Sequence, residues 1–79
     1  MTKSIFTPAY RLFLEDLIAV RRARRITQVQ LARALKKPQS YISKYESGER
    51  RLDLIEVLMV LRALQTDPLD FFRALLTKI

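Results

Sequence analysis

Apolar residues recur at helical spacing along almost the whole chain, with short polar breaks between the periodic stretches. The pattern predicts five helices, over about residues 8–24, 28–35, 38–47, 54–65 and 68–78. The chain has a single glycine and long stretches of good helix formers, which favour an all-α fold. We therefore expect one compact five-helix domain spanning residues 1–79.

Start signals precede four of these helices, because Ser, Thr, Asp and Asn can bond the free N–H groups of a first turn. Two of the signals are a cap residue followed by proline, namely Thr7-Pro8 and Asp67-Pro68. The other two are capping-box pairs at three-residue spacing, namely Thr27 with Gln30 and Asp53 with Glu56.

The apolar stripes predict which helix faces are buried. In helix 8–24 one stripe is expected in the core and consists of Phe13, Leu17 and Val20. A second stripe is expected to cover another helix or a partner subunit and consists of Tyr10, Leu14 and Ile18. The rest of the expected core is Ile26, Leu31, Ala32, Leu35, Ile42, Tyr45, Leu54, Val57, Val60, Leu61, Leu64, Phe71 and Leu75. Helix 54–65 has further apolar surface on another side, at Ile55, Leu58 and Met59.

The stretch from Thr27 to Gly48 holds two short predicted helices with a tight break between them. Pro38 lacks an N–H and disfavours helical geometry at Lys37, so the first helix must end before it. Pro38 suits the first position of the second helix, and Gly48 supplies the left-handed residue that commonly closes a helix. The second helix presents small or polar side chains to solvent, namely Gln39, Ser40, Ser43 and Lys44.

The strings T-Q-x-x-L-A-x-x-L and Q-S-x-I-S-K-x-E-x-G in this stretch resemble the helix-turn-helix of the phage repressor and Cro (Xre-type) family. The resemblance runs from about Phe13 to Phe72 and implies a lambda-repressor-like fold, with helices 28–35 and 38–47 as the DNA-binding motif. The family usually has glycine where Lys36 stands and often serine or threonine where Pro38 stands. Lys36 is therefore expected to hold a left-handed backbone at some cost.

Charge strengthens this interpretation, because the net charge of +7 is unevenly placed. Residues 21–51 contain ten basic and two acidic residues, a local charge of +8, and the remainder of the chain is near −1. A localised basic segment is typical of a surface that binds a polyanion such as double-stranded DNA.

A helix in the DNA major groove reads base edges with short, rigidly mounted side chains. In the resembling family three positions face base edges, which here are Gln39, Ser40 and Lys44. Ser43 lies on the same exposed side of the helix and is a fourth candidate. The candidate phosphate contacts are Gln28, Tyr41, Ser47, Arg50 and Arg51. Gln28 can also brace Gln39, and Tyr41 can instead be plain surface. The family pairs an arginine of the first helix with a glutamate near the end of the recognition helix, which here are Arg21 and Glu46.

Helix 68–78 has two apolar faces, and a core of this size needs only one. The face outside the expected core is a candidate dimer interface: Leu69, Phe72, Leu76 and Ile79. The alternative is a monomer in which Phe72 and Leu76 are both core. A two-fold dimer would place its recognition helices about 34 Å apart, one DNA turn, on a near-palindromic operator.

These observations predict a sequence-specific DNA-binding transcription regulator, a homodimer that represses by occupying its operator. Alternatives on the same fold are a restriction–modification controller, an antitoxin, or a protein-interaction module that has lost DNA binding. With no Cys or His and no glycine-rich phosphate loop, we expect no enzyme activity, metal, cofactor or small-molecule ligand. No membrane span or signal-peptide pattern is present, so we expect a cytoplasmic protein, nucleoid-associated when bound to DNA.

Overall fold

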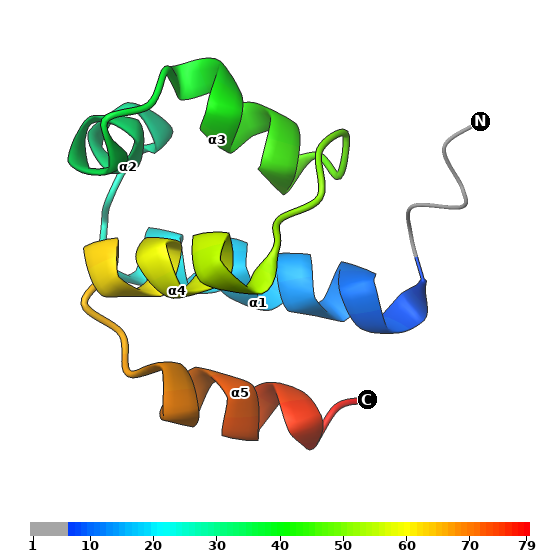
Figure 1. Ribbon diagram of the computed structural model, residues 1–79. Coiled ribbons are helices and arrows are strands. Elements are labelled where there is room, and N and C mark those ends of the chain that lie inside the picture. The colour runs from blue at the N-terminus through cyan, green and yellow to red at the C-terminus, as the bar shows by residue number, and fades with distance from the viewer. Residues whose placement is uncertain (1–6) are drawn as a thin grey trace.

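The computed structural model describes residues 7–79, and five helices arranged in three layers make up this part of the chain (Figure 1). The helices are α1 (Pro8–Ala23), α2 (Gln28–Leu35), α3 (Gln39–Glu46), α4 (Leu54–Ala63) and α5 (Pro68–Leu76). In Figure 1, α2 and α3 lie above a middle layer of α1 and α4, and α5 lies below it. The all-α fold with a helix-turn-helix is confirmed. Residues 1–6 of the expected domain lie outside the described part.

Local capping chemistry starts the helices where the sequence predicts. The side chains of Thr7 and Asp67 accept hydrogen bonds from backbone N–H groups of the turns that follow them, and a proline opens each helix. Both capping boxes are formed: Gln30 and Glu56 bond back to the N–H groups of Thr27 and Asp53 at 2.9 Å. The predicted start of α3 is wrong by one residue, because Pro38 keeps an extended ψ of 156° and serves as the cap.

Left-handed residues follow the first four helices. Lys36 holds the left-handed conformation expected of it, with φ 58° and ψ 44°, and Gly48 has φ 85°. Arg25 and Gln65 also have positive φ, and no glycine or other signal in the sequence predicts this. Gln65 therefore follows α4 as a turn residue instead of extending it. Helix α5 ends at Leu76, two residues before the predicted Lys78, with Thr77 in a right-handed conformation as its cap.

The core collects one face of each helix. It consists of Phe13, Leu14, Leu17, Leu31, Ala32, Ile42, Tyr45, Val57, Val60, Leu61, Leu64 and Phe71. One predicted core position is wrong: Leu54 is 63% exposed, because it opens α4 one turn before the buried stripe. On α1, Phe13 and Leu17 are buried as predicted and Val20 is half-buried against the core. Leu14 of the second stripe is also buried in the core, so the inner face of α1 is wider than the first stripe alone.

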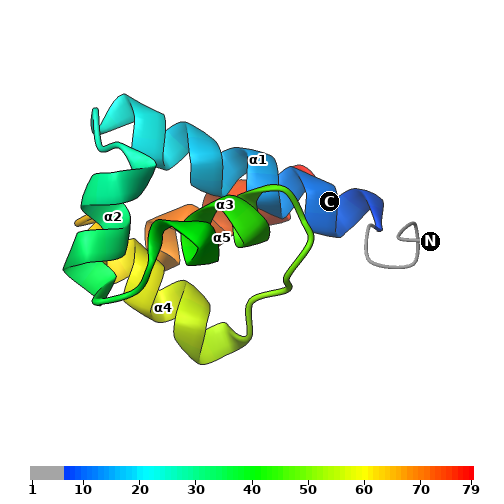
Figure 2. The same ribbon diagram turned by 90° about the horizontal axis from the view of Figure 1, so that it is seen from above.

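Polar contacts tie α5 and the α4 end to α1. The Lys78 ammonium pairs with the Asp16 carboxylate at 2.6 Å, and the Arg24 guanidinium donates to the Gln65 carbonyl at 2.9 Å. Viewed from above in Figure 2, α5 lies beneath α3, so the two views place these helices on opposite sides of the α1–α4 layer. Helix α3, the predicted recognition helix, and the C-terminal helix α5 therefore face away from each other.

Candidate nucleic-acid interface

Helix α3 is anchored by its inner side chains and presents a polar outer face. Ile42 and Tyr45 are fully buried, and burial, followed by the nearby charge of Glu46, raises the pKa of the Tyr45 hydroxyl. The opposite side of the helix is exposed and carries the four predicted base contacts, Gln39, Ser40, Ser43 and Lys44. A helix anchored on one face and polar on the other can enter a major groove without deforming the core.

A chain of hydrogen bonds runs from the core to this outer face. Arg21 Nε donates to Glu46 Oε2 at 2.7 Å and Arg21 Nη2 to Glu46 Oε1 at 3.1 Å, so the arginine–glutamate pair is bidentate. A third guanidinium nitrogen donates to the Ile26 carbonyl at 2.8 Å. Both side chains are over nine-tenths buried, which fixes the α1–α3 junction.

Gln28 continues the chain outwards. Its Nε2 donates to Glu46 Oε1 at 2.9 Å, and its Oε1 accepts from Gln39 Nε2 at 3.3 Å. The brace on Gln39 is therefore present. Gln39 keeps its Oε1 and a second N–H, which match the N6 donor and N7 acceptor of adenine.

Two serines of the motif differ in the hydrogen bonds that their hydroxyls make. Ser43 donates to the Ser40 carbonyl at 3.2 Å, so its oxygen remains an acceptor. Ser47 donates to the Lys44 carbonyl at 3.1 Å and accepts from the Glu49 N–H at 3.3 Å. Because a serine hydroxyl has one proton, this geometry does not favour the phosphate contact predicted for Ser47.

The loop after α3 carries Arg50, which pairs with the Glu56 carboxylate, a group whose expected role was only in the capping box of α4. Arg50 Nη2 lies 2.7 Å from Glu56 Oε2, and the Arg50 guanidinium stacks 4.7 Å from the centre of the Tyr41 ring. The bonds from Arg50 and the Asp53 N–H lower the pKa of the Glu56 carboxyl to about 2. Glu56 therefore positions Arg50 beside α3.

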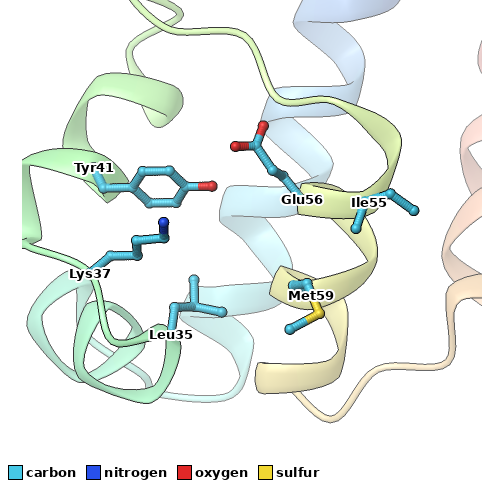
Figure 3. Close-up of a pocket in the computed structure, with 6 residues that line it drawn as sticks. All are labelled: Leu35, Lys37, Tyr41, Ile55, Glu56 and Met59. Carbon is cyan, nitrogen blue, oxygen red and sulfur yellow. The ribbon is translucent and has the colours of Figure 1, made fainter.

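Tyr41 and Arg51 make aromatic contacts. The Tyr41 ring is half-buried and its hydroxyl points toward Glu56 in Figure 3, and burial, then the Glu56 charge, raises its pKa. The ring of Tyr41 packs against the core and is therefore not plain surface, and the phosphate contact stays a prediction. The Arg51 guanidinium lies 4.1 Å from the centre of the Tyr10 ring. Tyr10 also accepts a bond from the Leu52 N–H at 3.2 Å, a role with no local sequence signal.

Comparison with known proteins identifies this arrangement. A helix-turn-helix family model matches residues 17–71. A solved structure of an XRE-family like protein from Pseudomonas syringae pv. tomato str. DC3000 is 42% identical, with a TM-score of 0.88, over 98% of this chain and 94% of that one. The chain belongs to the XRE family of helix-turn-helix proteins. No curated protein matches it.

Membership of the XRE family makes the chain a DNA-binding regulator. The family match covers all of α2 and α3 and thus includes every predicted base contact. From residue 7 to residue 79, this XRE-family chain has no helix with the length and apolarity that a membrane crossing requires.

Proposed function

We propose that this XRE-family chain is a sequence-specific transcriptional repressor that places α3 in the DNA major groove. The observation that carries the proposal is the hydrogen-bond chain from Arg21 and Glu46 through Gln28 to Gln39. Base discrimination needs a side chain held in one orientation, since a freely rotating amide reads no single base pair. Gln39 meets this need, and Ser40, Ser43 and Lys44 share its exposed face.

Phosphate contacts would come from the basic segment around α3. Arg50 and Arg51 are each seated on an aromatic ring, so their side chains are ordered before DNA arrives. The pairing of Arg50 with Glu56 leaves the guanidinium side chain 40% exposed, and it can still meet a phosphate oxygen. Such contacts fix register on the duplex and give binding its salt dependence.

We further propose a homodimer that uses the outer face of α5. Leu69, Leu76 and Ile79 are 68%, 67% and 59% exposed, and exposed apolar clusters of this kind are uncommon on monomers. Phe72 offers less exposed apolar surface to this interface than the sequence predicted, because its side chain is half-buried and packs against the core. Helix α5 lies opposite α3, so a dimer joined there would leave both recognition helices free for two half-sites.

Selection from a random DNA library tests the function. We expect the wild-type chain to enrich a near-palindromic site with half-site centres about one helical turn apart. Gln39→Ala should cost about 1–3 kcal/mol of binding and relax the preference at one base pair per half-site. Failure of the wild-type chain to enrich any sequence would favour the protein-interaction module. An unchanged site for Gln39→Ala would remove α3 as the reading element.

Sedimentation tests the dimer separately. Leu76→Glu should give a folded monomer with weaker operator binding, because a charge cannot be buried unpaired in an apolar interface. Leu54→Glu is the matched control, since Leu54 is 63% exposed but lies on α4. A wild-type monomer at tens of micromolar, or equal effects of the two substitutions, would contradict an α5 interface.

A further inference from the structure

A pocket of about 190 Å³ lies between the turn of the helix-turn-helix and α4 (Figure 3). Its lining residues are Leu35, Lys37, Tyr41, Ile55, Glu56 and Met59. Figure 3 shows side chains from the turn and α3 facing side chains of α4 across the space. The expected DNA contacts leave this pocket unexplained.

The pocket has an apolar part that water now contacts. Ile55, in the first turn of α4, and Met59, about one turn further on, are 64% and 49% exposed. Leu35, at the end of α2, and the ring of Tyr41 complete the apolar lining. An occupant that covered these groups would gain hydrophobic free energy.

The two charged groups that line the pocket, Glu56 and Lys37, differ in whether an opposite charge compensates them. The Glu56 carboxylate accepts from Arg50 at 2.7 Å and from the Asp53 N–H at 2.9 Å, so its charge is already compensated. The Lys37 ammonium lies 5.3 Å from the centre of the Tyr41 ring, and no ion pair found between residues 7 and 79 includes it. The unmatched charge of the pocket is therefore positive, which selects an anion.

Volume limits the size of that anion. Cavities of about 150 Å³ lined by apolar side chains hold benzene, so this pocket has space for one ring and a small substituent. We propose that the pocket binds a small single-ring carboxylate, with its ring against Leu35, Met59 and Tyr41 and its carboxylate on Lys37. No small-molecule ligand was expected from the sequence, because these residues come together only when α4 packs beside the turn.

Titration of the ¹⁵N-labelled full chain with phenylacetate, in the absence of DNA, tests this proposal. The amide chemical shifts are recorded at each step of the titration. Saturable shifts are expected at residues 35–41 and 55–59. The neutral 2-phenylethanol, of nearly the same shape, should bind roughly three- to fivefold more weakly, as expected for the loss of one partly exposed ion pair. Acetate should give no saturable shift there. Because DNA is absent, the outcome does not depend on the proposed repressor function.

Three variants locate the site. Lys37→Gln should remove the preference for phenylacetate over 2-phenylethanol, whereas Lys36→Gln, the same charge change one residue away from the pocket lining, should keep it. Met59→Trp should fill the pocket and abolish the binding of both phenylacetate and 2-phenylethanol. Because Met59 is half-exposed, the protein should still fold with the larger side chain. Equal binding of the acid and the alcohol, equal effects of the two lysine variants, or unchanged binding to Met59→Trp would overturn the proposal.

Discussion

Two arginine–glutamate pairs flank α3, and they differ in their surroundings more than in their geometry. Arg21–Glu46 and Arg50–Glu56 each have a shortest N–O distance of 2.7 Å and a second bond between the same groups. The side chains of the first pair are 9% and 7% exposed, and those of the second are 40% and 25% exposed. The first joins α1 to the end of α3, and the second joins the loop after α3 to the start of α4.

This difference separates a structural pair from an adjustable one. Removing one partner of a buried pair leaves an uncompensated charge away from water, which strongly destabilises the fold. Water can solvate either partner of an exposed pair, so that pair is worth little to stability and its arginine can change partner. The buried pair therefore orients α3, and the exposed pair holds a cation ready for a phosphate.

Breaking the buried pair should have the largest effect. Glu46→Ala leaves the Arg21 charge buried without its carboxylate, so the free energy of unfolding should fall by about 3–5 kcal/mol. Chemical denaturation of the purified protein measures the change. The control is Glu49→Ala, at an exposed position three residues further on, which should stay within about 0.5 kcal/mol of wild type. Similar losses in both variants would contradict a structural role for the Arg21–Glu46 pair.

Removing the hydrogen bonds that connect the buried pair to the outer face of α3 should have a smaller effect, which should be seen in DNA binding. Gln28→Ala removes the link from Glu46 to Gln39, and a single hydrogen bond of this kind contributes about 0.5–1.5 kcal/mol. We expect weaker operator binding and a relaxed preference at the base pair read by Gln39. Titration of labelled operator and of a variant operator measures both. A uniform loss on all sequences would instead indicate that Gln28 acts only as a phosphate contact.

Removing the arginine of the exposed pair should change the salt dependence of binding. Arg50→Ala should lower the slope of log binding constant against log salt by roughly one unit, and Arg51→Ala should do the same. Affinity should fall alike on all sequences. Arg62→Ala, on α4 and outside the basic segment, is the control. An unchanged slope in both loop variants would remove the loop from the interface.

Neutralising the acid of the exposed pair should have the smallest effect, visible in the pH dependence of stability. The Glu56 pKa is lowered from 4.5 to about 2, so its charge stabilises the fold above about pH 4.5, and this contribution is lost as the pH falls toward 2. Glu56→Gln can keep the capping box but lacks the charge. Its free energy of unfolding should be slightly lower than wild type at pH 7, and the two should converge near pH 2. A constant difference across that range would mean that the Glu56 charge adds nothing.

Much of the fold follows from signals that act within three or four residues. The caps at Thr27 and Asp53 bond to the turns they open, and their three-residue partners complete them, so these helix starts need no tertiary help. The left-handed conformation of Lys36 was expected from the family resemblance, because the family usually has glycine at that position. The boundaries that were missed lie mainly at C-terminal ends, where Arg25 and Gln65 take left-handed conformations without a glycine to announce them.

The candidate site divides in the same way. The polar outer face of α3 was predictable, because the spacing of Ile42 and Tyr45 decides which side is inward. The partner of Arg50 was not, since Glu56 already had a local role in the capping box and nothing in the spacing indicated a second one.

The sequence by itself determined the five helices, their order, the helix-turn-helix and the side of α3 that carries polar groups. These follow from helical periodicity and capping, which are local properties. Only the tertiary structure decided that Leu14 is buried and Leu54 exposed, that Phe72 packs on the core, and that the turn and α4 enclose a pocket. The physical reason is that the rotation of each helix about its axis depends on every helix packed against it, and a rotation of a few tens of degrees exchanges one apolar stripe for the next.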